Sequence, residues 1–187
     1  MTAATSYAQL TGDYDIDVAH SPLGFVARHA MVSKIRGAFT RFRGQLHLNG
    51  ADPSKSWAEV VIDAASIDTG SAERDRHLRS DDFFDMATYP ELTFRSTAVE
   101  PLGGDRFAVS GELTVRGVTR SIQLDVTYTG SAVDPFGNTR VGLEAHGTIH
   151  RKDFGMTWNA PLGAGGVLVS DKIELDIDIS AIKRTNA

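Results

Sequence analysis

Apolar and polar residues alternate along much of the chain with the period of two that is typical of β-strands with one dry face. The clearest case is DKIELDIDIS at 171–180, where four apolar side chains fall on one face and charged side chains on the other. The same pattern recurs at 120–130 and 140–150, and in shorter form at 41–48, 58–67 and 107–115. Phe39 is out of phase with Phe42, which predicts a bulge or a sharp coil between them.

Segments rich in Gly, Pro, Asn and Asp separate these strands and predict turns. They lie at 49–56, 100–106, 116–120, 134–138 and 161–166. Strands with mostly short connections and no amphipathic helices between them indicate an antiparallel sheet. Because each strand has one dry face, the sheet must pack on a second sheet or close on itself. We therefore expect an all-β fold in a single domain over 1–187, with a core at about 12–182.

The charged segment 68–90 departs from the alternation. Its first part, 71–79, contains helix formers and no period of two, so it predicts a helix. The following SDDFFDM at 80–86 predicts a short helical turn, with Ser80 as its N-cap and two aspartates in the first turn. Pro90 is expected to end this helical excursion.

Composition excludes several classes of protein. The chain has no cysteine, which removes thiol nucleophiles and cysteine-based zinc sites. Its net charge of -5 disfavours a nucleic-acid partner, and no apolar run is long enough for stable membrane insertion. The first 21 residues have neither a basic nor an apolar leader region, so we expect a cytoplasmic protein. A secreted protein already trimmed of its leader would show the same pattern.

Candidate catalytic and metal-binding residues are few. His146 and His150 are four residues apart in an extended segment, hence roughly 13 Å apart at about 3.3 Å per residue, too far to share an ion. Asp75 and His77 point to different sides of the predicted helix. The glycines at 163–166 precede a strand and not a helix, which argues against a phosphate loop. We predict no catalytic residue and no metal ligand.

Aromatic residues are spread over the strands and the helical excursion. A barrel of roughly eight strands can be filled by such side chains or can enclose one ligand. Several expected inward positions carry small residues, which would leave room inside. They are Gly44, Gly111, Ala145 and Gly147.

Five segments together resemble one known family, the YceI family of polyisoprenoid-binding, lipocalin-like proteins. The resemblance runs from Tyr14 to about Ile182. The segments are YDIDVAHSPLGFVARH, RGAFTRFRGQL, SIDTGSAERDRHLRSDDFFDMATYPELTFRST, VSGELTVRGVTRSIQLDV and HRKDFGMTW. Each is weak alone, but their combination in this order is specific.

The resemblance implies an antiparallel lipocalin-like barrel of about eight strands with short capping helices. It further implies non-enzymatic binding, transport or storage of an isoprenoid quinone or polyprenyl phosphate in an apolar tunnel, with no other cofactor. By residue type and pattern we assign the tunnel lining to Phe25, Phe39, Phe42, Phe83, Phe84, Phe94, Phe154 and Trp158. Candidate head-group contacts are His20, Arg28, His29, Arg151 and Lys152, since a phosphate or quinone oxygen needs donors.

Two alternatives stay open from the sequence. One is an enzyme acting on a lipid or small hydrophobic substrate, with His77 or His150 as base and an aspartate that orients it. The other is an interaction module whose barrel is completely packed. Homodimer formation is also left open.

Overall fold

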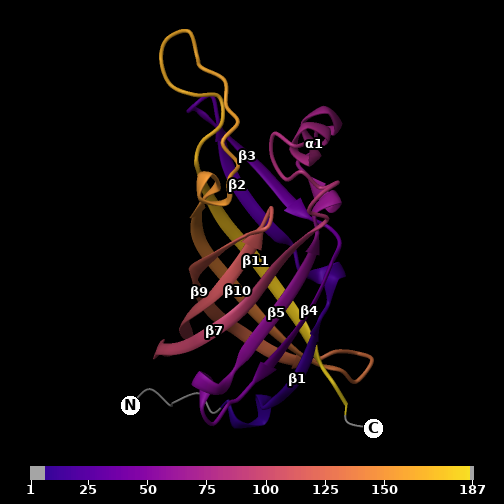
Figure 1. The fold of residues 1–187 in the computed structure, drawn as a ribbon. Helices are drawn as coiled ribbons and strands as arrows, with labels where there is room; N and C mark the ends of the chain where they lie inside the picture. Colours follow the sequence, from indigo (N-terminus) through magenta and orange to yellow (C-terminus); the bar gives the residue numbers. More distant parts are fainter. Residues whose placement is uncertain (1–6, 186–187) are drawn as a thin grey trace.

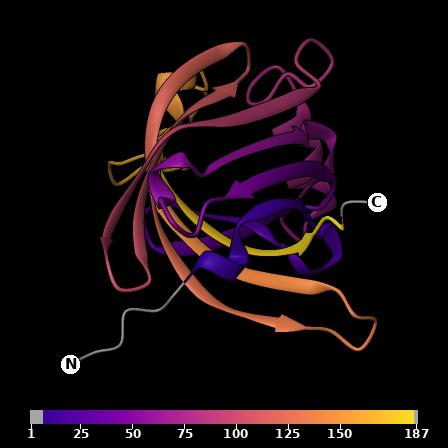
Figure 2. The ribbon, with the colours of Figure 1, turned by 90° about the horizontal axis from the view of Figure 1, so that it is seen from below.

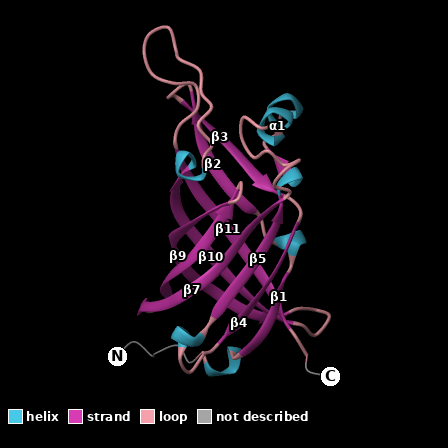
Figure 3. Cartoon of the chain, viewed as in Figure 1, coloured by secondary structure: helices cyan, strands magenta, loops and turns pink. Residues whose placement is uncertain are grey.

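The computed structural model describes residues 7–185, and its main feature is a closed antiparallel barrel (Figures 1 and 3). Within these residues eight strands form the ring in the order β1-β4-β5-β7-β8-β9-β10-β11, and β11 pairs again with β1. Seen from below, the strands encircle the interior (Figure 2). The strands are β1 Gly12–Ile16, β4 Phe42–Leu48, β5 Trp57–Asp63, β7 Glu91–Gly103, β8 Arg106–Val115, β9 Val118–Val133, β10 Thr139–His150 and β11 Lys172–Lys183. The prediction of an antiparallel barrel is confirmed, and closure explains how the dry faces avoid water.

A second group of strands extends the barrel at the upper end of Figure 1. It consists of β2 Leu23–His29, β3 Ser33–Phe39 and the short β6 Ile67–Asp68. The edge of β11 is shared: residues 181–183 pair with β1, whereas residues 174–177 pair with β2. The barrel wall beside β11 is therefore β1 in its lower half and β2 in its upper half.

The expected irregularity between Phe39 and Phe42 is a complete change of partner. β3 ends at Phe39 and β4 begins at Phe42. β3 pairs with β2 and β6, while β4 pairs with β1 and β5. Two residues, Thr40 and Arg41, connect the strands, so the chain passes from the upper extension to the lower barrel there. This explains why the two phenylalanines are out of phase.

The helical excursion is confirmed as α1 Ala72–Arg79, with Ser71 as N-cap. The prediction that Ser80 is the N-cap of a second helical turn is wrong. Ser80 is the C-cap of α1, and its hydroxyl donates to the carbonyl of His77 at 2.6 Å. Residues 81–84 form hydrogen-bonded turns and no helix, and the N–H groups of Phe83 and Asp85 both donate to the Ser80 carbonyl.

The remaining helical elements are single 3-10 turns at strand ends. They are η1 Ala8–Leu10, η2 Val18–His20, η3 Pro53–Lys55, η4 Ala64–Ser66 and η5 Arg151–Phe154. No helix within residues 7–185 is long and apolar enough to cross a membrane.

Two buried clusters form the core. The upper cluster includes Phe39, Phe83 and Phe154, and the lower one includes Tyr14 and Leu46. The sequence suggested that the inward glycines leave empty room in the barrel, but neighbouring side chains occupy the space beside Gly111 and Gly44. A Cβ on Gly111 would lie 2.5 Å from the ring of Phe94, and one on Gly44 would lie 2.6 Å from the Ile16 side chain. The glycines let neighbouring side chains lie flat on the sheet.

Candidate ligand cavity

An apolar cavity of about 340 Å³ follows the inside of the barrel. Every strand of the ring contributes side chains to its wall, from Leu46 and Leu48 near the lower end to Ile149 and Ile173 near the upper end. Arg151 is the one charged residue among those that line it. This size lies within the range of small-molecule sites, and such a wall can hold a long apolar chain with few polar contacts.

Five of the eight predicted lining residues are in the cavity wall. They are Phe25, Phe39, Phe83, Phe84 and Phe94. The rings of Phe25 and Phe39 have centroids 5.9 Å apart, and Phe39 contacts Phe84 edge-on at 5.7 Å. These contacts join β2 and β3 to the segment that follows α1. The upper wall is therefore aromatic over several elements.

The other three predicted lining residues are not in the wall. Phe42 begins β4 directly after the break and packs against the lower core cluster. Phe154 is 1 % exposed within the upper core cluster, because η5 turns it into the packing between elements. Trp158 packs on the ring of His77 at 4.6 Å. Aromatic type predicted burial for these residues, but not which side of the wall they face.

Three arginines hold the segments that cover the upper end, and sequence reasoning missed two of them. Arg79 donates to the carbonyls of Ala65 and Ile67, which fixes α1 to η4 and β6. Arg116, in the β8–β9 turn, donates to the carbonyls of Phe83 and Gly155. No local pattern marks these roles, because the acceptors are backbone atoms distant in sequence.

Arg151 is the third of these arginines and lines the cavity itself. Its side chain is 3 % exposed and donates to four carbonyls, those of Ser170, Met156, Trp158 and Val169, at 2.8 to 3.3 Å. Burial lowers the pKa of its guanidinium. The ring of Phe83 lies 5.8 Å from the guanidinium carbon. A buried cation bound to neutral carbonyls therefore stands at the upper end of an apolar cavity.

Three other predicted head-group residues lie at the same end. The Arg28 N–H donates to the Ser170 hydroxyl oxygen, and the Ser170 N–H donates to the Arg28 carbonyl. His29 forms a β-bridge with Val169. The backbone N–H of Lys152 donates to Asp171 at 3.0 Å. The structure thus gathers Arg28, His29, Arg151 and Lys152 around one short segment, 168–171. Of these four, only Arg151 lines the cavity.

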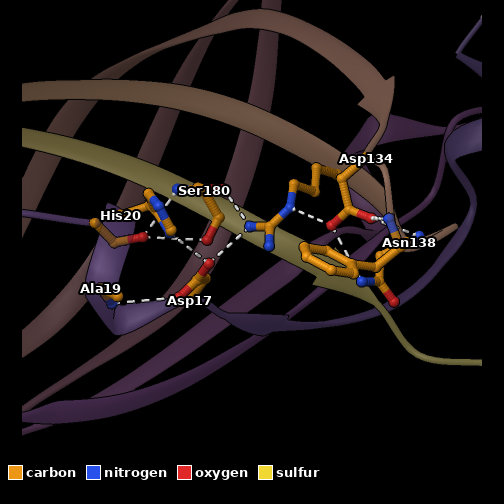
Figure 4. Close-up of polar contacts among 9 residues, drawn as sticks. Asp17, Ala19, His20, Asp134, Asn138 and Ser180 are labelled. Carbon is orange, nitrogen blue, oxygen red and sulfur yellow. Dashed lines mark hydrogen bonds and ion pairs between the residues drawn. The ribbon is translucent and has the colours of Figure 1, made fainter.

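His20 lies elsewhere, in a polar cluster on the outside of the lower barrel (Figure 4). Its Nδ1 is 2.8 Å from Asp17, which also accepts from Arg140 at 2.7 Å. Arg140 donates in addition to Asp134 in the β9–β10 turn. Hydrogen bonds from Arg140 lower the pKa of both carboxyl groups, most strongly that of Asp134. This cluster fixes the turn to the β1–β2 connection, which accounts for His20 without a ligand.

Both histidines proposed as bases have an aspartate partner, but neither is a cavity residue. His77 Nε2 is 2.8 Å from Asp82, and His150 Nδ1 is 3.0 Å from Asp171. The structure places neither imidazole among the groups that line the cavity. Within residues 7–185 no group of three or more His, Asp or Glu side chains is arranged to hold a metal ion.

The lower end of the wall contains residues that sequence reasoning missed. Tyr7 lines the cavity there with Asn49, Ser56 and Trp57. The Tyr7 ring packs edge-on against Tyr128 at 5.3 Å. Tyr7 precedes the first strand and follows no alternation, so nothing in the local sequence marks it as a wall residue.

Comparisons with known proteins agree with this architecture. A family model described as the YceI-like domain matches residues 14–181. A UPF0312 protein of Yersinia pestis is 36 % identical over 181 residues, which cover 96 % of this chain and 91 % of the relative. A UPF0312 protein of Pectobacterium atrosepticum is 36 % identical over 183 residues, covering 97 % and 92 %.

Solved structures show the same fold. BcnA of Burkholderia cenocepacia has a TM-score of 0.76 at 26 % identity, covering 88 % of this chain and 98 % of BcnA. The YCEI protein of Campylobacter jejuni has a TM-score of 0.74 at 30 % identity, covering 84 % and 90 %. A polyisoprenoid binding domain from Saccharophagus degradans has a TM-score of 0.64 at 22 % identity, covering 91 % and 98 %. With a family model that spans nearly the whole barrel, this chain belongs to the YceI-like domain family.

Proposed function

We propose that the protein binds an amphiphilic isoprenoid, an isoprenoid quinone or a polyprenyl phosphate, and carries or stores it without chemical change. The observation that carries this proposal is the cavity: it follows the barrel interior and has one charged residue in an otherwise uncharged, mostly apolar wall. A packed interaction module has no use for such a space, so the cavity argues against that alternative.

A long apolar tail is favoured because each buried carbon adds to the free energy of binding. Burial of each CH₂ group contributes roughly 0.8 kcal/mol, so a tail of several isoprene units gains affinity without specific polar contacts. The cavity by itself supports an apolar ligand of no particular class. The isoprenoid class is supported by the description of the S. degradans domain as polyisoprenoid binding.

The head group is proposed to lie at the upper end, near Arg151. A guanidinium has five N–H donors, and four contacts to carbonyls are present here. The remaining donor suits a phosphate or quinone oxygen, and a buried cation whose hydrogen bonds go to neutral carbonyls favours an anionic or electron-rich group. Arg28, His29 and Lys152 surround the same end and would contact a larger head group.

An enzymatic role is the second candidate, and its test is direct. The His77–Asp82 and His150–Asp171 pairs have the geometry of an oriented base, at 2.8 and 3.0 Å. Both pairs are outside the cavity wall. If the protein is a carrier, His77→Ala and His150→Ala leave the bound isoprenoid chemically unchanged and bound in equal amount. A chemical change in the isoprenoid that either substitution abolishes would establish catalysis.

The proposal is tested by identifying the bound molecule. An organic extract of freshly purified protein is analysed by mass spectrometry beside native mass spectrometry of the intact sample. Empty protein is titrated with isoprenoid quinones and polyprenyl phosphates while its Tm is followed, because a ligand that binds only the folded state raises Tm. An empty extract together with an unchanged Tm for every ligand would favour the packed module.

Cytoplasmic location and dimer formation stay predictions.

A matched pair of substitutions on β10 localises binding to the cavity. Ala145 is 7 % exposed and lines the cavity, whereas His146 points to the outside of the same strand. Ala145→Phe fills part of the cavity and is expected to abolish the ligand-induced rise in Tm. His146→Phe adds the same ring outside and should leave that rise intact. Equal rises for both variants would place the ligand elsewhere.

A further inference from the structure

An apolar tip projects from the upper end of the molecule (Figure 1). We define it as residues 30–32, the turn between β2 and β3, and residues 162–168 of the loop beside it. Ala30 donates to the carbonyl of Leu168 at 2.7 Å, so the turn and the loop form one unit. Met31 is 56 % exposed, Val32 75 % and Val167 38 %. Three large apolar side chains are therefore exposed on a turn and a loop that are hydrogen-bonded to each other.

The backbone of this turn is unfavourable for the residues it carries. Ala30 has φ 51° and Met31 φ 65°, and Val32 donates to the carbonyl of His29 at 3.1 Å. Positive φ at both central positions of this turn is the left-handed geometry that ordinarily holds Asn, Asp or Gly. Left-handed geometry at Ala and Met costs stability, and Met31 stays 56 % exposed although its Cγ lies near Gly166. Such a strained, exposed apolar turn points to a function outside the folded core.

The charged side chains of the β2–β3 hairpin that carries the turn are all basic, and one of them, Arg36, is ion-paired with Asp176. Residues 28–36 contain Arg28, His29, Lys34 and Arg36 and no acidic residue, although the whole chain carries a net charge of -5. Residues 155–170 contain no charged residue at all. At the base of the loop Asp171 is already bound, to the His150 ring and to the backbone of Lys152. Exposed apolar side chains flanked by basic ones match the interface of a bilayer that contains anionic lipids.

The tip is also continuous with the cavity wall. Val169 lines the cavity and forms a β-bridge with His29, one residue before the turn. Ala27, two residues before His29 on β2, lines the cavity as well. A surface that receives the tip would thus lie against the upper end of the cavity.

We propose that the apolar tip docks on an anionic lipid bilayer, with Met31, Val32 and Val167 entering the interface and Arg28 and Lys34 contacting lipid phosphates. The proposal rests on the proposed function in one respect: docking would bring the cavity to the membrane that holds an isoprenoid. Docking itself requires no ligand and is tested without one.

The test is flotation of ligand-free protein with vesicles. Vesicles of phosphatidylglycerol and phosphatidylcholine are compared with vesicles of phosphatidylcholine alone. The wild type is expected to float with the anionic vesicles, and to float less in high salt. Met31→Ser with Val32→Ser should lower the partition coefficient roughly tenfold or more, since two partly buried apolar side chains are lost. Lys34→Gln should lower it about fivefold on anionic vesicles only.

Phe136 supplies the control. It is 88 % exposed in the β9–β10 turn at the opposite end of the barrel, so Phe136→Ser should leave flotation unchanged. The proposal is overturned if the wild type does not float, if the double variant floats as well as the wild type, or if Phe136→Ser gives the same loss. Conversion of a dimer to a monomer by the double variant, with no flotation of the wild type, would make the tip a protein interface and also overturn it.

The ligand test separates this proposal from the proposed function. The Met31→Ser, Val32→Ser protein is titrated with isoprenoid in solution while its Tm is followed. A normal rise in Tm with lost flotation supports docking and leaves the cavity proposal intact. Flotation without any ligand-induced rise in either protein would refute isoprenoid binding alone.

Discussion

Arg151 offers the sharpest test of how the upper end is held together. Its side chain is 3 % exposed, and it donates to carbonyls of Met156, Trp158, Val169 and Ser170. Arg151→Met keeps most of the side-chain length but removes the Arg151 donors, and of the four carbonyls that of Val169 still accepts from the Asn159 side chain at 2.7 Å. Each buried acceptor left without a partner costs about 1–3 kcal/mol, and each lost hydrogen bond to a charged group is worth about 1.5–3 kcal/mol.

These terms do not add in full. The loop that carries the carbonyls lies at the surface, so water can reach some of them after the substitution. Removal of the cation also relieves its own desolvation, which is what lowers the pKa of Arg151. If about two carbonyls stay buried without a partner, the free energy of unfolding falls by about 3 kcal/mol. For a domain of this length that corresponds to a fall in Tm of roughly 6–12 °C.

Urea titration and thermal melting measure the change, and Lys152→Met is the matched control. Lys152 is the next residue and is exposed, so its substitution should change the free energy of unfolding by less than about 0.5 kcal/mol. Proteolysis between 155 and 170 should accelerate in Arg151→Met only. A variant within about 1 kcal/mol of the wild type would refute the reasoning, because the carbonyls would then have other donors.

Three further predictions concern the barrel and its outer cluster. Gly111→Ala should lower the free energy of unfolding by about 1–3 kcal/mol in urea titration, because its Cβ would lie 2.5 Å from the Phe94 ring and 2.7 Å from the Arg95 carbonyl. Arg140 lowers the pKa of Asp17 and Asp134 below the ordinary value of 3.8. Their ion pairs therefore contribute fully to stability above pH 3.8, and this contribution is lost as the pH falls through the lowered pKa values. The urea midpoints of the wild type and Arg140→Met should accordingly differ most at neutral pH and converge in acid. Arg116→Met should lower Tm and speed proteolysis of both segments that it joins, at Phe83 and Gly155, and unchanged cleavage there would contradict its bridging role.

Much of the fold could be predicted because short sequence patterns indicate each strand of the barrel and the turns between strands. The alternation in β11 and in β9 shows one dry face for each strand, and short turns impose antiparallel order. Closure follows, because a sheet with one dry face and no covering layer has few other solutions. The shared edge of β11 could not be predicted. Which half of a strand pairs with β1 and which with β2 depends on contacts between distant segments.

The candidate site was predictable only in part, for a related reason. Aromatic type identifies residues that avoid water, and Phe154 and Trp158 do so by packing between elements and not by lining the cavity. Period-two alternation identifies an inward face only within a strand, so it could not assign residues in η5 or in the loop after it.

The arginines show where pattern reasoning fails most clearly. Arg79, Arg116 and Arg151 all donate to backbone carbonyls, which every residue possesses, so no sequence motif marks the acceptor. Loops that cover an apolar cavity have buried carbonyls that form no hydrogen bond to a neighbouring strand. A long arginine side chain with several N–H donors can bind several of these carbonyls at once. Hydrogen bonds from three arginines thus help to fix the loops at the upper end, together with bonds of Asn159 and of the loop backbone, whereas the rest of the wall is fixed by strand pairing. If the cavity opens to admit a chain, we expect it to open where these side-chain bonds replace a continuous sheet. Hydrogen exchange should accordingly be faster in residues 80–89 and 155–170 than in β8 to β11.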